Sequence, residues 1–209
     1  MLTLHEYSPS LNCWKIRVLL DLIGTPYRSR EVALFRGESR TDDFLKLNPA
    51  GAVPALELDD GRTIAESSAI LCYLAQGTRF LPDERYARAK ILQWLSFEQY
   101  YIEPTIGSLR FWTLTGRLEV NAGRMIASRR ENGERALAAL ERTLRDTSFL
   151  VGDELTIADI AVYGYTHLAE DGGFDLAPHP ALCAWIEQVG TEVGPGHPVL
   201  PYTKDAALA

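Results

Sequence analysis

Strand and helix signals alternate through the first eighty residues of this chain, and strand signals then disappear. Residues 2–7 alternate as a short strand does, and residues 14–23 carry apolar side chains at the spacing of one helical face. A second strand is predicted over residues 27–34. A short helix over residues 42–47 should end there, because the residue before Pro49 is driven out of the helical region. This order allows two parallel strands joined by a right-handed crossover.

A β-hairpin signal comes next. An Asp-Gly pair at residues 60–61 separates two short alternating runs, residues 55–58 and 62–64, and this is the strongest local hairpin signal. A helix over residues 67–75 follows. The pattern indicates an α/β domain of thioredoxin type over residues 1–77.

An all-helical domain is predicted over residues 85–209, after a linker at residues 78–84. Its expected helices span residues 87–114, 118–144, 156–168 and 181–189, and the second should be interrupted near residues 132–133.

Three local features add detail to the predicted helical domain. Pro104 should kink or split the first helix, because proline lacks the backbone N–H and crowds the preceding turn. Thr156 and Asp159 have the spacing of a capping box. The tail from Gly194 contains three prolines, so we expect it to extend over the surface.

Composition narrows the class of protein. The net charge is −7 and the pI is about 5.2, which argues against nonspecific binding to nucleic acid or anionic membrane. No apolar run approaches the roughly 18–20 residues that span a bilayer, and the N-terminus lacks a secretory signal pattern. The chain has three cysteines, Cys13, Cys72 and Cys183, and this odd number fits a reducing compartment better than a disulfide framework. We expect a soluble, cytoplasmic globular protein.

Four segments, residues 10–13, 48–54, 66–71 and 156–160, together resemble the cytosolic glutathione transferases over nearly the whole chain. The first, Ser-Leu-Asn-Cys, is most similar to serine-type bacterial enzymes related to the theta and nu classes. The resemblance implies a thioredoxin-like glutathione-binding domain, an all-helical second domain and a homodimer. It also implies glutathione as a co-substrate and no other cofactor.

The resemblance implies that the Val53-Pro54 peptide bond is cis, so that the backbone of Val53 pairs with the cysteinyl backbone of glutathione. Taken in isolation, a trans bond is the commoner state. Glu66 and Ser67 lie where a helix begins, and the backbone N–H groups there can bind the γ-glutamyl carboxylate with the Ser67 hydroxyl. Glu66 would face the ammonium group of the ligand. Alternatively, Ser67 only caps the helix.

Ser10 is the catalytic candidate, since it lies at the first position of a thioredoxin-type C-x-x-C pattern that ends at Cys13. A hydroxyl that donates to the glutathione sulfur favours the reactive thiolate. Lowering a thiol pKa by roughly two units takes about 2.7 kcal/mol, and one hydrogen bond to a charged group supplies roughly 1.5–3 kcal/mol. Asn12 could share the donation. The alternatives are that Ser10 is only a cap or turn residue, or that Ser8 takes its place.

The position before Val53 departs from the family pattern. Relatives often carry a basic or polar residue there, which can meet the glycyl carboxylate, and this chain has Ala52. Arg40, with Arg36 and Ser39 as alternatives, could substitute from the preceding loop.

Aromatic side chains in the helical domain are candidates for the second-substrate pocket. We assign Trp94 and Ile102 to the core, and the pocket candidates are Tyr100, Tyr101, Glu103 and Phe111. The competing reading is that these side chains are also core or interface. The four histidines show no metal-ligand spacing, so no metal site is predicted.

The leading function is conjugation of glutathione to small hydrophobic electrophiles. A glutathione-dependent disulfide reductase is the enzymatic alternative, and a non-enzymatic binding module of the same fold is the other. The partners expected are glutathione, a small electrophile or disulfide, and a second copy of the chain. The dimer contact is expected on residues 72–75 and 90–97. No nucleic acid or membrane partner is expected.

Overall fold

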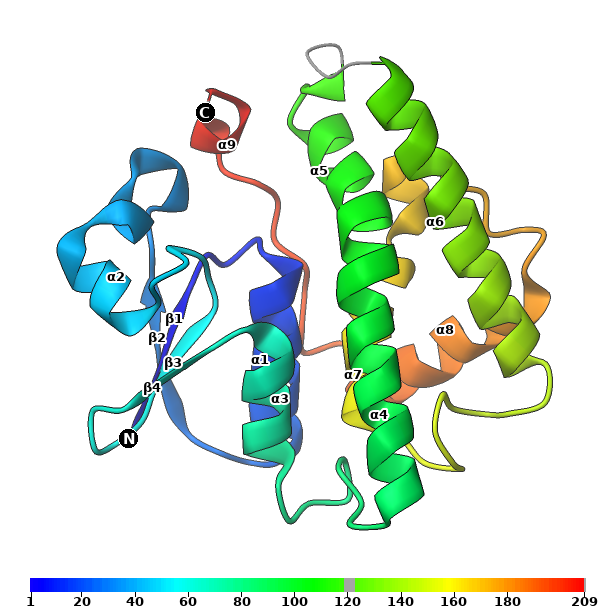
Figure 1. Ribbon diagram of the computed structural model, residues 1–209, viewed down its shortest axis with the longest axis horizontal. Coiled ribbons are helices and arrows are strands. Elements are labelled where there is room, and N and C mark those ends of the chain that lie inside the picture. The colour runs from blue at the N-terminus through cyan, green and yellow to red at the C-terminus, as the bar shows by residue number, and fades with distance from the viewer. Residues whose placement is uncertain (119–122, 209) are drawn as a thin grey trace. The chain divides into compact units, whose positions relative to one another are not determined.

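A four-stranded sheet of order β2-β1-β3-β4 organises the first part of the chain (Figure 1). Its strands are β1 (Leu2–Glu6), β2 (Tyr27–Glu31), β3 (Ala55–Glu57) and β4 (Thr63–Ala65). β1 and β2 are parallel, and the other two pairings are antiparallel. This computed structural model describes residues 1–118 and 123–208. The predicted thioredoxin-type topology is confirmed.

Helices cover both faces of this sheet. They are α1 (Leu11–Leu22), α2 (Asp42–Leu47) and α3 (Ser67–Ala75), with short 3₁₀ turns η1 (Leu34–Arg36) and η2 (Glu38–Arg40). In Figure 1, α1 and α3 lie on one side of the sheet and α2 on the other. Leu4, Ile16 and Ile70 are fully buried between the sheet and these two helices, which explains the helical spacing of apolar residues in the sequence.

The second strand is shorter than predicted. β2 ends at Glu31, because Ala33 leaves the extended region (φ −72°, ψ 68°) and η1 begins at the next residue. The predicted hairpin is confirmed. Its turn is closed by a hydrogen bond from the Gly61 N–H to the Leu58 carbonyl at 3.0 Å, and Gly61 takes a positive φ of 81°.

The second unit, Arg79–Pro195, is helical. Its elements are α4 (Arg85–Phe97), η3 (Glu98–Gly107), α5 (Ser108–Leu114), α6 (Gly123–Leu144), α7 (Ile157–Thr166), η5 (Ala169–Gly172) and α8 (Pro180–Val193). Phe80 and Leu81, expected in a linker, are buried in this unit. None of the described helices is long and apolar enough to cross a membrane.

Pro104 does not split its helix. The chain stays helical from α4 into α5, and Pro104 lies inside η3, whose turns are of the wider π type. Wider turns re-aim the backbone donors and acceptors, so a missing N–H is accommodated without a break.

Two further predictions concern α6 and α7. The interruption expected near Asn132-Gly133 is absent, and Gly133 lets the Phe174 ring pack against the helix, because a Cβ there would overlap the ring. Residues 119–122, at the expected start of this helix, lie outside the described residues. The capping box of Thr156 and Asp159 is confirmed at the start of α7.

The buried carboxylate of Asp159 does more than cap a helix. It accepts hydrogen bonds from the Leu150 N–H (2.8 Å), the Thr156 N–H (3.0 Å) and the Trp185 indole N–H (3.0 Å). It therefore joins the loop before α7, α7 itself and α8.

The C-terminal tail corrects the predicted domain boundary. Residues Gly196–Ala209 group with Met1–Thr78 rather than with the helical unit, and the tail ends in a short helix, α9 (Lys204–Leu208), rather than staying extended. The Trp14 indole N–H donates to the His197 carbonyl at 2.8 Å, so the tail packs on α1.

Candidate glutathione site

Strand register brings three segments to one end of the sheet. His5 in β1 is opposite Ala55 in β3, and Ala55 is opposite Ala65 in β4. β1 and β4 therefore end where β3 begins. Consequently the turn after β1, the residues before β3 and the start of α3 lie at the same end of the sheet. These segments carry all the predicted glutathione residues except Arg40, which lies in η2.

Ser10 occupies the N-cap of α1. Its backbone is extended (φ −69°, ψ 126°), and its Oγ accepts the Cys13 N–H at 3.4 Å. The predicted capping role is therefore present. It uses a lone pair and leaves the half-buried hydroxyl proton for another acceptor, so capping and thiolate stabilisation are compatible at this residue.

Asn12 and Ser67 are in contact across the site. The Ser67 hydroxyl donates to Asn12 Oδ1 at 3.2 Å, and Ser67 is buried while Asn12 is half-buried. Because the amide oxygen accepts this bond, the NH₂ group is the part of Asn12 that can donate to a ligand. This contact fixes the start of α3 relative to the start of α1.

The start of α3 has no side-chain cap. Glu66 is the residue before the first helical position, and it makes no capping hydrogen bond. It is exposed and takes a positive φ of 66°, which is uncommon for a residue other than glycine. Ser67 is already helical and its hydroxyl bonds to Asn12, so the alternative in which Ser67 merely caps the helix is wrong. The first N–H groups of α3 can meet an anion.

The peptide bond between Val53 and Pro54 is cis, as predicted. The loop before it is held by buried Asn48, whose side-chain NH₂ donates to the Ala52 carbonyl at 2.7 Å. Asn48 Oδ1 also accepts the Ala50 N–H at 3.0 Å. This local network sets the backbone that leads into Val53.

Of the three candidates for the glycyl carboxylate, only Arg40 places its side chain against the loop that leads into Val53. Its Nη1 donates to the Ala50 carbonyl at 2.9 Å, and its guanidinium covers Gly51 so closely that a Cβ there would lie 2.6 Å from Nη1. Arg36 is directed to Asp205 instead, and Ser39 is buried. Arg40 is therefore better placed than Arg36 or Ser39 to meet a carboxylate at this loop.

Ser8 is engaged elsewhere. Its N–H donates to both carboxylate oxygens of Glu31 at 3.1 Å, and its hydroxyl donates to the same carboxylate. This commits the Ser8 hydroxyl proton to a carboxylate, whereas the Ser10 hydroxyl has the Cys13 sulfur, a weak acceptor, beside it. Ser10 is therefore the better donor candidate.

Sequence reasoning missed how the turn after β1 is supported. Arg17 donates to the Ser8 carbonyl at 2.9 Å and pairs with the buried carboxylate of Glu6. Glu6 also accepts the Ser29 hydroxyl at 2.6 Å. The available signal was that Glu6 shares a strand face with apolar Leu4, because alternate residues point the same way.

Cys13 is not a second reactive thiol. Its side chain is fully buried, and burial raises its pKa to about 12, although hydrogen bonds from Ser10 and Tyr7 act in the opposite direction. A thiol with this pKa is almost entirely protonated near neutral pH.

The second-substrate candidates divide into two pairs. Tyr100 and Tyr101 are 75% and 46% exposed, and they line a cavity of about 800 Å³. The rest of its lining consists of Gln93, Ser96, Phe97 and Gln99. Glu103 and Phe111 do not line this cavity, and the Phe111 ring instead lies 5.1 Å from the Arg117 guanidinium carbon. Trp94 and Ile102 are buried, as predicted.

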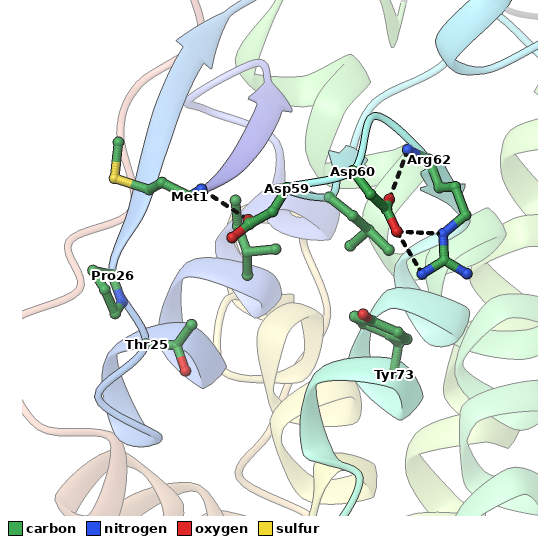
Figure 2. Close-up of a pocket in the computed structure, with 9 residues that line it drawn as sticks. Met1, Thr25, Pro26, Asp59, Asp60, Arg62 and Tyr73 are labelled. Atoms are coloured by element: carbon green, nitrogen blue, oxygen red, sulfur yellow. Dashed lines mark hydrogen bonds and ion pairs between the residues drawn. The ribbon is translucent and has the colours of Figure 1, made fainter.

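A further cavity, of about 550 Å³, lies at the opposite end of the strands (Figure 2). It is bounded by the start of β1, the hairpin turn and Tyr73. Its carboxylates are already paired, because Asp59 contacts the N-terminal ammonium at 2.8 Å and Asp60 contacts the Arg62 guanidinium at 2.7 Å. No predicted glutathione residue lines this cavity. Within residues 1–118 and 123–208, no cluster of three or more His, Cys, Asp or Glu side chains could hold a metal ion.

Each of the two units matches a known protein domain. Residues 9–76 match the glutathione S-transferase N-terminal domain, and residues 118–191 match the glutathione S-transferase C-terminal domain. A solved glutathione S-transferase from Pseudomonas fluorescens is 42% identical, with a TM-score of 0.90 over 95% of this chain and 98% of that chain.

Other relatives carry different names. A solved glutathione transferase from Phanerochaete chrysosporium, in complex with oxidized glutathione, is 27% identical, with a TM-score of 0.81 over 91% of this chain and 90% of that chain. The disulfide-bond oxidoreductase YfcG of Escherichia coli is 28% identical over 93% of each chain. Elongation factor 1-gamma of Artemia salina is 33% identical over 76% of this chain, which spans only 36% of that protein.

The two domain matches and the bacterial structure cover both units, in the order in which the chain forms them. The chain belongs to the glutathione S-transferase family.

Proposed function

We propose that this chain binds glutathione at this end of the sheet and joins it, through its sulfur, to small hydrophobic electrophiles. The observation that carries the proposal is the Ser67–Asn12 hydrogen bond beside the Ser10 cap. It puts a helix start that can bind an anion beside two groups that can donate to a ligand, the Ser10 hydroxyl and the Asn12 amide.

Each part of glutathione has a matching group. The γ-glutamyl carboxylate meets the uncapped N–H groups at the start of α3, where the helix dipole favours an anion. The cysteinyl backbone pairs with the backbone of Val53, and exposed Glu66 faces the ammonium. The Arg40 guanidinium, which already lies on the 50–51 loop, takes the glycyl carboxylate in place of a residue at Ala52.

Catalysis rests on holding the sulfur as a thiolate. The Ser10 hydroxyl and the Asn12 amide donate to the sulfur, and the start of α1 adds its dipole. A hydrogen bond to a charged group is worth roughly 1.5–3 kcal/mol, and about 2.7 kcal/mol lowers the thiol pKa by roughly two units. The thiol proton leaves to solvent. The thiolate then attacks the electrophilic carbon, a C–S bond forms, and the leaving group departs with its bonding electrons.

For the electrophile, the best-supported contacts are Tyr100 and Tyr101. The cavity that they line contains no charged side chain, so it suits an uncharged, partly aromatic compound. Glu103 and Phe111 are weaker candidates, since neither lines it.

Disulfide reduction is the second candidate function. It is favoured by the NH₂ group of Asn12, which has no partner among the described residues, and by the likeness to YfcG, which is named a disulfide-bond oxidoreductase. Because Cys13 is buried and protonated, this chemistry needs two glutathione molecules. The first thiolate forms a mixed disulfide and releases one thiolate, and the second forms glutathione disulfide and releases the other.

Calorimetric titration of glutathione tests the site, with Ser67→Ala compared against Ser68→Ala. Ser68 is the next residue of the same helix, and its buried hydroxyl has no hydrogen-bond partner among the described residues. We expect Ser67→Ala to weaken binding by roughly 1–2 kcal/mol and Ser68→Ala to leave it unchanged. Equal affinities in both variants would refute the site.

Turnover distinguishes the functions. We expect wild type to conjugate an aryl halide, and Ser10→Ala to lower kcat by roughly 10- to 100-fold, as the loss of one charged hydrogen bond implies. Turnover of a low-molecular-weight disulfide without aryl-halide conjugation would support the second candidate. Glutathione binding with neither activity would indicate a binding module.

A further inference from the structure

The C-terminal tail contacts both sides of the turn that carries Ser10. The His197 carbonyl accepts the Trp14 indole N–H at 2.8 Å, on the first turn of α1. On the other side of Ser10, the Tyr7 hydroxyl oxygen accepts the Thr203 N–H at 2.9 Å. The tail therefore runs along the strand-to-helix turn, and Figure 1 shows it passing α1 before it ends in α9.

Tyr7 is tightly held at this contact. Its side chain is 4% exposed, and its ring packs edge-on against Phe35 with centroids 5.3 Å apart. Besides accepting the Thr203 N–H, its hydroxyl lies 2.9 Å from Thr203 Oγ1. The two hydroxyl groups therefore share one hydrogen bond, in which either oxygen can be the donor.

The backbone of Tyr7 connects this contact to the proposed sulfur site. The Ser10 N–H donates to the Tyr7 carbonyl at 2.8 Å and so closes the turn. Beyond Thr203, Asp205 accepts the Arg36 Nε–H at 2.5 Å, and Ala206 is fully buried. The exposed ion pair adds little stability by itself, but buried Ala206 shows that the end of the tail packs on this unit.

We propose that Tyr7 and Thr203 are positioning residues, through which the C-terminal tail fixes the turn that presents the Ser10 hydroxyl to the glutathione sulfur. This inference rests on the proposed function. The Tyr7 hydroxyl does not touch the sulfur itself, because the buried phenol is engaged by both the backbone N–H and the hydroxyl of Thr203. It acts through the Ser10 turn, and the tail thereby becomes part of the glutathione site.

The first test measures backbone amide exchange in the full chain without glutathione. Tyr7→Phe keeps the ring and removes both hydrogen bonds, and Thr203→Val removes only the hydroxyl of an exposed side chain. We expect exchange in residues 8–13 and in residues 199–206 to rise together, roughly two- to tenfold per hydrogen bond lost. The matched controls are Tyr86→Phe, at a tyrosine that is 71% exposed, and Thr191→Val in α8.

The second test measures the pH profile of conjugation at saturating electrophile. Misplacing the Ser10 hydroxyl should move the half-maximal rate to higher pH in both test variants, while the KM for the electrophile stays unchanged. Thr203→Val should show the smaller effect.

Two results would overturn the inference. In one, Tyr7→Phe accelerates exchange only in the tail, so the tail does not support the turn. In the other, Tyr7→Phe lowers activity while Thr203→Val changes neither exchange nor pH profile, so the phenol acts directly. Coupled exchange in a protein that shows no glutathione chemistry would instead support the link between tail and turn and refute the proposed function.

Discussion

Replacing Ser10 by cysteine tests the sulfur site most directly. A thiol at the N-cap of α1 faces the first N–H groups of the helix, which lower a thiol pKa and make it nucleophilic. With glutathione disulfide, the Ser10→Cys thiolate should attack one sulfur, form a mixed disulfide and release one glutathione thiolate. We expect the protein to gain one glutathionyl group and to lose aryl-halide conjugation.

The lifetime of this adduct depends on Cys13, which stands where a resolving thiol would be. Its pKa is raised to about 12 by burial, so at pH 7.5 its thiolate fraction is roughly 3,000-fold below that of a thiol with an ordinary pKa. The higher intrinsic nucleophilicity of a basic thiolate recovers roughly 40-fold. Attack by Cys13 should therefore be about 100-fold slower than by an ordinary thiol, and its burial slows attack further.

Intact-protein mass spectrometry over time checks this reasoning. The matched control is the double variant Ser10→Cys with Cys13→Ala, which cannot form an internal disulfide. We expect the adduct to persist equally in both. Rapid loss of the adduct from the single variant alone would show that Cys13 is reactive, and full conjugating activity with no adduct would show that Ser10 is not at the sulfur.

Three other predictions follow from the packing and from the family resemblance. Asp159→Ala should lower the free energy of unfolding by roughly 3–5 kcal/mol in chemical denaturation, since four buried donors, three N–H groups and the Thr156 hydroxyl, lose their acceptor. A loss below about 1 kcal/mol would show that solvent replaces the carboxylate. The pKa of the Cys13 thiol is higher in the folded protein than in the unfolded chain. The thiol therefore contributes fully to the free energy of unfolding below the unfolded-state pKa, and this contribution declines as pH rises toward 12. The stability difference between wild type and Cys13→Ala should thus narrow by roughly 2 kcal/mol from pH 8 to 10.5, and a constant difference would contradict the raised pKa. We also expect a homodimer, which Leu92→Glu should dissociate because Leu92 is 53% exposed on the expected contact face; light scattering that gives a monomer mass for wild type would refute it.

Local signals in the sequence were reliable where neighbouring residues determine the structure. The Asp-Gly turn, the capping box at Thr156 and the helical spacing around α1 depend on interactions within a few residues, and all three were predicted. The resemblance also predicted the cis bond before Pro54. For Pro104 the local rule left a kink or a split open, and the structure excludes the split, because the helix continues through wider turns.

Only the tertiary structure decided which groups meet at one end of the sheet. Ser67 bonds to Asn12 instead of capping its own helix, and Arg40 rather than Arg36 lies on the loop before Val53. The tail was assigned to the wrong unit, because its prolines indicate extended backbone without indicating what that backbone packs on. Contacts such as Tyr7 with Thr203 join residues far apart in the sequence. Tyr7 and Thr203 are 196 residues apart, so no local periodicity or spacing in the sequence can predict their contact.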